Sequence, residues 1–140
     1  MALPAFAAGT GPYGSCPGRW STPPERLSPP ERAAAGALYT ALMTETCLRL
    51  AGASGPVIVE GPFANNAAFL AALAALVPAP VIARPDATGT TDGAALLAFG
   101  PQAAAPIEYA PAVAPLAFDL GAYAARWRTA ADAALSGARR

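Results

Sequence analysis

Short apolar runs alternate with helical patterns between positions 57 and 99, and this alternation is the clearest structural signal in the chain. The β-branched stretch 57–60 has no polar alternation, which predicts a short strand buried on both of its faces. The stretch 66–77 is apolar nearly all round and predicts a buried helix that ends before Pro78. A second strand is expected at 81–83, and a helix capped by Asp92 is expected to end at Phe99. A helix that joins two strands over so short a distance favours a parallel crossover connection.

Two longer helices flank this region. Ser28 and Glu31 enclose two prolines in a capping-box pattern, which predicts a helix from there to about Leu50. Within it, Gly36 suggests close contact with a neighbouring helix, because glycine costs about 1 kcal/mol relative to alanine in a helix. Cys47 is interpreted as a small core residue. A last amphipathic helix is predicted near the C-terminus from four apolar residues at helical spacing: Leu120, Tyr123, Trp127 and Leu135.

Glycine and proline dominate positions 1–32, which therefore predict an irregular loop. Aromatic residues such as Tyr13 and Trp20 interrupt this loop, so we expect it to lie against an apolar surface. We divide the chain into this loop region (1–32), an α/β core (33–100), and a connector with the C-terminal helix (101–140). Two strands are too few for a free-standing sheet, so the chain is expected to hold an incomplete domain.

Composition narrows the class of protein. The 140 residues fit one domain; 54% are hydrophobic, 13% are charged, and the formal net charge is zero. A neutral chain offers no electrostatic surface for nucleic acid or for an anionic membrane, so neither is expected as a partner. The N-terminus has no basic segment followed by an apolar core, and no apolar run is long enough to span a bilayer. We expect a soluble, cytoplasmic protein.

The absence of histidine and lysine excludes several kinds of chemistry. Without histidine there is no Ser-His or Cys-His nucleophile and no imidazole metal site, and no GxSxG motif supports a small hydrolase. Without lysine there is neither a P-loop lysine nor a Schiff base. Cys16 and Cys47 are far apart in the sequence and are expected to be free thiols. No catalytic residue and no metal ligand is assigned within the chain.

The turn after the first predicted strand is the best candidate for a binding site. A strand that ends in a glycine turn and continues into a helix start is a common way to form a nucleotide or phosphate shelf. The alternative is an ordinary turn at Gly61 and an N-cap at Asn66. Glu60 is expected to be solvated or paired with an arginine. Five polar residues later in the chain could suggest a magnesium or phosphate loop: Asp86, Thr88, Thr90, Thr91 and Asp92. For these residues we favour ordinary turn formation and helix capping.

These residues resemble the C-terminal domain of FGGY-family carbohydrate kinases over about positions 1–100. The family has a strand, a Gly-Gly turn, an Ala-x-Asn sequence and a helix, followed by a Gly-Ala-Ala helix. Here the matching segments are Glu60-Gly61-Pro62-Phe63-Ala64-Asn65-Asn66, then Pro80-Val81, then Gly93-Ala94-Ala95. An upstream loop containing Gly9-Thr10-Gly11-Pro12 resembles the family's loop before its long helix.

The resemblance implies an α/β, actin-like (ribonuclease H-like) fold and a two-domain kinase that uses ATP and Mg²⁺. It implies that the turn lines the adenine and α-phosphate side of the ATP cleft, with Gly61 at the first glycine and Asn66 at the asparagine. Pro62 replaces the second glycine and lacks an N–H, and Phe63 replaces a small residue and reshapes the adenine slot. The catalytic aspartate, the first phosphate loop and most magnesium contacts belong to the family's N-terminal domain, which this chain does not match.

Two hypotheses follow. The first is the ATP-side C-terminal portion of a sugar kinase, inactive alone, with an N-terminal kinase domain or a second copy as its partner. The second is a non-enzymatic α/β interaction module or a degenerate kinase fragment, which the low charge and high apolar content favour. The sequence does not identify the sugar.

Overall fold

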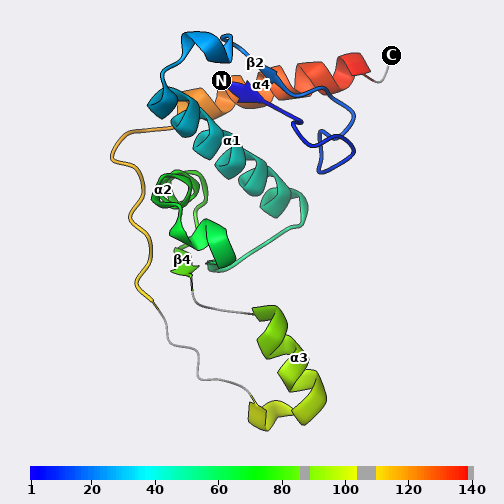
Figure 1. The fold of residues 1–140 in the computed structure, drawn as a ribbon, viewed down its shortest axis with the longest axis vertical. Coiled ribbons are helices and arrows are strands. Elements are labelled where there is room, and N and C mark those ends of the chain that lie inside the picture. Colours follow the sequence, from blue (N-terminus) through cyan, green and yellow to red (C-terminus); the bar gives the residue numbers. More distant parts are fainter. Residues whose placement is uncertain (86–88, 104–109, 139–140) are drawn as a thin grey trace.

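The computed structural model describes residues 1–85, 89–103 and 110–138 (Figure 1). Eight strands and α-helices are formed within the described residues. In chain order these are β1 (Ala2–Leu3), β2 (Arg19–Trp20), α1 (Pro29–Leu50), β3 (Val57–Glu60), α2 (Ala67–Leu76), β4 (Val81–Arg84), α3 (Gly89–Phe99) and α4 (Gly121–Ala138). Single 3₁₀ turns lie at 24–26 (η1), 61–65 (η2) and 101–103 (η3).

Helix α1 starts where the sequence predicts. Ser28 and Glu31 form the capping box, with the Ser28 N–H donating to Glu31 Oε2 at 2.8 Å. These hydrogen bonds from Ser28 hold the pKa of the Glu31 carboxyl below its ordinary value. Because the capped end fixes the helix in place along the chain, its buried positions follow at helical spacing: Ala37, Ala41, Leu42 and Thr46.

Two expectations for α1 are wrong. Cys47 is exposed, because its neighbour Thr46 takes the buried position and donates its hydroxyl to the Leu42 carbonyl at 2.8 Å. Gly36 has no close neighbour, since a Cβ placed on it would meet no atom within 4 Å. Both cysteines are free thiols, as predicted, with Cys16 buried.

Strands β3 and β4 are parallel and are joined by α2, which confirms the predicted crossover. The register pairs Val57 with Val81 and Glu60 with Arg84. Helices α1 and α2 pack together and against one face of this sheet, in a core that includes Ala41, Leu73 and Val81. The expectation that β3 is buried on both faces is wrong. Ile58 is 48% exposed, because the sheet has two strands and this core lies on one side of it.

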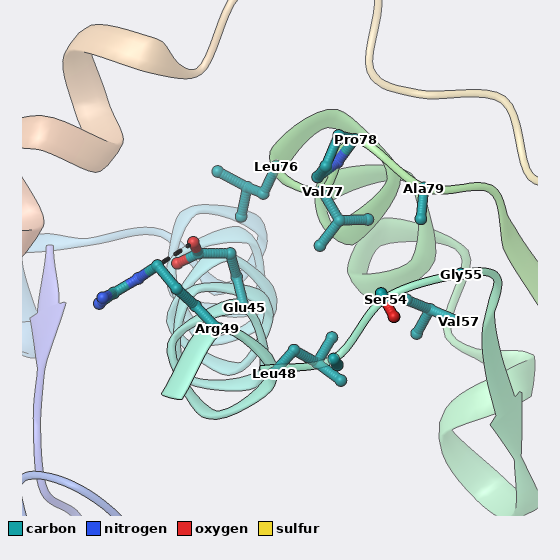
Figure 2. A pocket seen from close by; sticks show the side chains of 11 residues that line it. Glu45, Leu48, Arg49, Ser54, Gly55, Val57, Leu76, Val77, Pro78 and Ala79 are labelled. Atoms are coloured by element: carbon teal, nitrogen blue, oxygen red, sulfur yellow. Dashed lines mark ion pairs between the residues drawn. The ribbon is translucent and has the colours of Figure 1, made fainter. Parts of the chain in front are cut away.

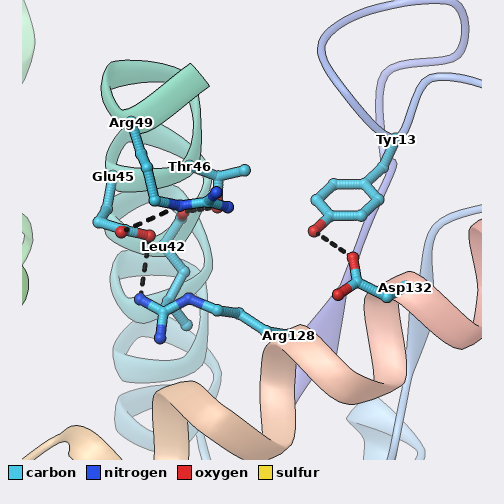
Figure 3. Close-up of polar contacts among 7 residues, drawn as sticks. All are labelled: Tyr13, Leu42, Glu45, Thr46, Arg49, Arg128 and Asp132. Carbon is cyan, nitrogen blue, oxygen red and sulfur yellow. Dashed lines mark hydrogen bonds and ion pairs between the residues drawn. The ribbon is translucent and has the colours of Figure 1, made fainter. Parts of the chain in front are cut away.

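A second core joins the N-terminal segment to α1 and α4. Trp127 is fully buried there, and its indole N–H donates to the Ala2 carbonyl at 2.8 Å. The Tyr13 ring packs edge-on against Trp127, and its hydroxyl donates to Asp132 at 2.9 Å (Figure 3). The segment 1–32 therefore lies against an apolar surface, as expected, although β1 and β2 form a short antiparallel pair within it. The predicted C-terminal helix is confirmed as α4.

Helix α3 lies apart from the other helices (Figure 1). None of its described side chains is buried, and Leu97 is 91% exposed. The helix begins at Gly89, so the expected start at Asp92 is wrong by three residues. The Gly89 N–H donates to the Glu60 carboxylate. Glu60 therefore supplies the hydrogen-bond acceptor at the start of this helix, a role that the sequence analysis assigned to Asp92. In the part of the chain that the structure describes, none of the helices combines the length and apolar character needed to cross a membrane.

Replacing Gly36 with alanine should stabilise the fold by about 0.5–1 kcal/mol, because alanine is the better helix former and meets no atom there. Urea unfolding of the Gly36→Ala variant measures this gain. Gly14→Ala is the matched control: its Cβ would lie 2.7 Å from the Thr10 backbone nitrogen, so it should destabilise. A loss of stability in Gly36→Ala would contradict the open space found beside Gly36.

Stability should fall as the pH rises from about 10 to about 12. Burial, and then the hydrogen bond and charge of Asp132, raise the pKa of Tyr13 from its ordinary 10.0 to about 12. A raised pKa means that the contribution of neutral Tyr13 is fully present below pH 10 and is lost as the folded state titrates near 12. Urea unfolding as a function of pH tests this, and Tyr13→Phe should reduce the slope. An equal slope in wild type and Tyr13→Phe would contradict it.

Candidate functional site

The candidate site lies at the carboxyl ends of β3 and β4. In open α/β sheets, ligands bind beyond this end of the parallel strands. The parallel register brings the ends of both strands to the same edge, where η2 and the first turn of α2 follow β3. All four residues predicted for the nucleotide site, Gly61, Pro62, Phe63 and Asn66, lie on this stretch.

Glu60 connects three elements at this edge. Its Oε1 lies 3.4 Å from Arg84 Nη1 at the end of β4, and its Oε2 accepts the Gly89 N–H at 3.2 Å. A side chain at position 89 would collide with the same carboxylate. Glu60 is thus the arginine-paired carboxylate that the sequence favoured, and it is already engaged by protein groups. Sequence reasoning did not identify Arg84 or Gly89, although the parallel register makes Glu60 and Arg84 partners.

Gly61 makes the turn possible. Its φ of +68° lies in the left-handed region, which residues with a Cβ rarely adopt. No atom lies within 4 Å of a Cβ built on it, so the backbone conformation and not crowding requires glycine. The space beside Gly61 is therefore open on the side where a Cβ would point.

Pro62 and Phe63 extend the exposed surface. Pro62 occupies the first turn of η2, where its missing N–H breaks no hydrogen bond of the 3₁₀ turn. Phe63 is 50% exposed, and its ring centroid is 5.2 Å from that of the buried Phe69 in a tilted edge contact. Phe69 thus supports one edge of the Phe63 ring. Within the turn, Ala64 is buried and Gly61 is half-buried, whereas the other residues are exposed.

Asn66 caps α2. Its Oδ1 accepts the Phe69 N–H at 3.0 Å, as the structural alternative for this residue predicted. The N–H groups of Ala67 and Ala68 in the first turn have no partner within the helix, and both residues are exposed. We call the stretch from Gly61 to Ala68 the ledge. It offers backbone donors, an amide side chain and half of an aromatic ring.

Three of the five polar residues predicted for the later loop lie among the described residues. Thr90, Thr91 and Asp92 are exposed in the first turn of α3, whereas Asp86 and Thr88 lie outside the described residues. Within the described ranges, no group of three or more cysteine, aspartate or glutamate side chains is placed to hold a metal ion.

A cavity of about 530 Å³ lies at the opposite end of β3 (Figure 2). It is lined by aliphatic residues such as Leu48, Val57 and Val77, with Glu45 and Arg49 at one side. Sequence patterns do not indicate this cavity, because its walls come from the ends of α1 and α2 and the start of β3.

An ion-pair cluster lies beside this cavity (Figure 3). Glu45 Oε2 is 3.0 Å from Arg128 Nη2 on α4, and Glu45 Oε1 is 3.7 Å from Arg49 Nε. The contact with Arg128 is close but poorly aligned for a hydrogen bond. The i,i+4 spacing of Glu45 and Arg49 is visible in the sequence, but the partner on α4 is not. This cluster ties α1 to α4 and is distant in sequence from the ledge.

Comparison with known proteins points to a kinase family. The model of the carbohydrate kinase FGGY C-terminal domain matches residues 1–106. A solved structure, a carbohydrate kinase from Novosphingobium aromaticivorans, has a TM-score of 0.76 and 35% sequence identity to this chain. That match covers 96% of this chain and 28% of the kinase, so the chain spans little more than a quarter of that protein. No curated protein sequence matches.

These matches confirm the predicted α/β, ribonuclease H-like fold class and the resemblance on which it was based. The family match covers the N-terminal segment, α1, the β3–α2–β4 unit and α3. The chain therefore belongs to the FGGY carbohydrate kinase family, as a C-terminal domain.

Proposed function

We propose that this chain is the ATP-side portion of an enzyme that transfers the γ-phosphate of ATP to a sugar hydroxyl. The observation that carries the proposal is the open ledge at Gly61 and Asn66, in a chain whose family is a family of carbohydrate kinases. An inward-packed turn at this position would have left no surface for a nucleotide. The exposure of Pro62 and Phe63 is consistent with a surface that a second domain covers.

In this proposal the ledge binds the adenosine part of ATP. The exposed half of the Phe63 ring forms an apolar wall for adenine, and the N–H groups that begin α2 face the α-phosphate. Asn66 contributes its side-chain amide N–H₂, since its Oδ1 is engaged in the helix cap. Pro62 contributes no donor, so the contacts come from residues on either side of it.

Catalysis requires groups that the described residues do not supply. Phosphoryl transfer depends on a positioned base, on magnesium and on phosphate clamps acting together. The described residues hold no acidic cluster for Mg²⁺, and Glu60 is engaged by Arg84 and Gly89. We therefore assign the base, the metal ligands and the sugar site to an N-terminal kinase domain, and we expect no activity from the chain alone. We place the enzyme in the cytoplasm, where ATP is available and the two thiols stay reduced.

A non-enzymatic interaction module is the second candidate. Three apolar side chains of α3, Leu96, Leu97 and Phe99, are exposed, which is a feature of surfaces that meet a partner. This candidate predicts a defined complex and no response to nucleotide.

A chimera tests the enzymatic proposal. Residues 1–140 would replace the matching 28% of the Novosphingobium aromaticivorans kinase, and thermal unfolding would be followed with and without ATP and Mg²⁺. ATP at about 100 times its Kd should stabilise the chimera by about 2.7 kcal/mol, and ATP consumption should depend on an added sugar. The Novosphingobium aromaticivorans kinase without the replacement is the positive control. A folded chimera that neither responds to ATP nor consumes it would contradict the proposal.

Two substitutions at Asn66 separate the cap from nucleotide binding. Asn66→Ala should destabilise the isolated chain by about 1 kcal/mol, because α2 loses its cap. Asn66→Asp keeps a capping oxygen, so stability should be retained, but it removes the amide donor and adds a negative charge beside the phosphates. Urea unfolding of the chain and ATP titration of the chimera measure the two effects. Unchanged ATP affinity in Asn66→Asp would remove Asn66 from the nucleotide site.

A further inference from the structure

The cavity at the start of β3 has the size and the walls of a small-molecule site (Figure 2). Its volume of about 530 Å³ lies within the range of about 300–1,000 Å³ that is usual for ligand pockets. Such pockets have mostly apolar walls and a few polar groups that orient the ligand. The ledge lies beyond the other end of β3, so the proposed function assigns no role to this cavity.

The walls of the cavity are aliphatic. Leu48 comes from the end of α1, Val57 from the start of β3, and Leu76 and Val77 from the end of α2. All four residues are half-buried, so each keeps apolar surface that a ligand can cover. None of the described residues that line the cavity is aromatic, which favours an aliphatic ligand over a planar ring that would need a stacking partner.

Arg49 supplies a positively charged group at the rim. Its side chain is 58% exposed, and Figure 2 shows the guanidinium directed away from the aliphatic walls. Glu45 comes closest to Arg49 at Nε, 3.7 Å away, which is beyond hydrogen-bonding distance. The terminal nitrogens of Arg49 therefore form no hydrogen bond with Glu45. This fork of N–H donors is the group that binds carboxylates through two parallel hydrogen bonds.

The balance of charge beside the cavity favours an anion. Glu45 lies between two arginines, because its Oε2 is also 3.0 Å from Arg128 Nη2. Asp132, on the same helix as Arg128, accepts the Tyr13 hydroxyl at 2.9 Å, and no ion pair joins it to either arginine within the described residues (Figure 3). One carboxylate thus serves two guanidinium groups. A negatively charged ligand at the rim would balance the second.

We propose that this cavity binds a small aliphatic monocarboxylate. The aliphatic body occupies the space between the ends of α1 and α2 and the start of β3, and the carboxylate accepts N–H groups of Arg49 at the rim. Because the charge stays at the rim, the ligand avoids the large cost of burying an ion in an apolar site. An aliphatic amine of the same shape would instead be repelled by the arginines.

Titration of the 140-residue chain with octanoate, below its micelle-forming concentration, tests the site. NMR amide signals of cavity residues such as Leu48, Ser54 and Val77 should shift and reach saturation. Acetate has the carboxylate without the body and should cause no shift there, and octylamine should bind at least about 10-fold more weakly. Saturable shifts confined to exposed apolar residues of α3, such as Leu97 and Phe99, would overturn the proposal.

Two variants separate the carboxylate from the aliphatic body. Arg49→Gln changes an exposed side chain, so it should alter the Tm little and weaken octanoate binding about 10-fold. Ala79→Trp fills the cavity that Ala79 lines, so it should abolish binding. Arg126→Gln is the matched control, because Arg126 is exposed on α4 and does not line the cavity.

Each variant can overturn the proposal. Unchanged octanoate affinity in Arg49→Gln would refute recognition of the carboxylate, and unchanged affinity in Ala79→Trp would place the ligand elsewhere. These experiments use neither ATP nor a second domain. Failure of the carboxylate site therefore leaves the proposed function intact, and a chimera that does not respond to ATP leaves the carboxylate site intact.

Discussion

Packing on both sides of α1 is the interaction on which the rest of the structure depends. Toward α2, α1 presents Ala37 and Ala41, whose small side chains let the two helices approach closely. Toward the N-terminal segment and α4, it presents Leu42, which lies in the same core as Trp127. Helix α1 thus contributes buried residues to both cores, and its contact with α2 helps to fix the position of α2. Because the ledge includes the first residues of α2, the position of the ledge depends on α1 as well.

The exposure of Ile58 and of α3 has a common physical basis. Helices α1 and α2 cover one face of the β3–β4 sheet, and the sheet is too small to provide a second packed layer around itself. Apolar side chains that face away from this core, such as Ile58 and Leu97, consequently meet solvent. A domain of this size gains much of its stability from buried apolar area, so unburied apolar residues indicate surface meant for further contacts.

Local signals in the sequence predicted most elements correctly. The capping box at Ser28 and the proline after α2 are short-range patterns, and each marks an element end that the structure reproduces to within about two residues. The parallel crossover follows from element order and short connections, and it is also correct. These features depend on residues that are neighbours in the sequence, which is why they can be read from it.

Features set by distant residues could not be predicted in the same way. The core position in α1 belongs to Thr46 and not to Cys47, a difference of one residue that depends on how the helix is rotated against its neighbours. Helix α3 starts early because the Glu60 carboxylate accepts its first N–H, across 29 positions. The Glu45–Arg128 pair spans an even larger separation. The expectation that β3 is buried on both faces was wrong because the two-stranded sheet has a packed core on one side only, which the local pattern of apolar residues does not reveal.

At the ledge, the structural and the functional interpretations of Asn66 support each other. The cap uses Oδ1, and this hydrogen bond to Phe69 fixes the plane of the side-chain amide. The N–H₂ group is then oriented before any ligand arrives. Immobilising a polar side chain on binding costs about 0.5–1.5 kcal/mol, and an amide already held by a helix cap avoids most of that cost. Gly61 and Pro62 restrict the backbone in the same region, one by its left-handed φ and the other by its ring. A rigid turn of this kind suits a surface that closes against a second domain, because little conformational freedom remains to be lost when the two meet.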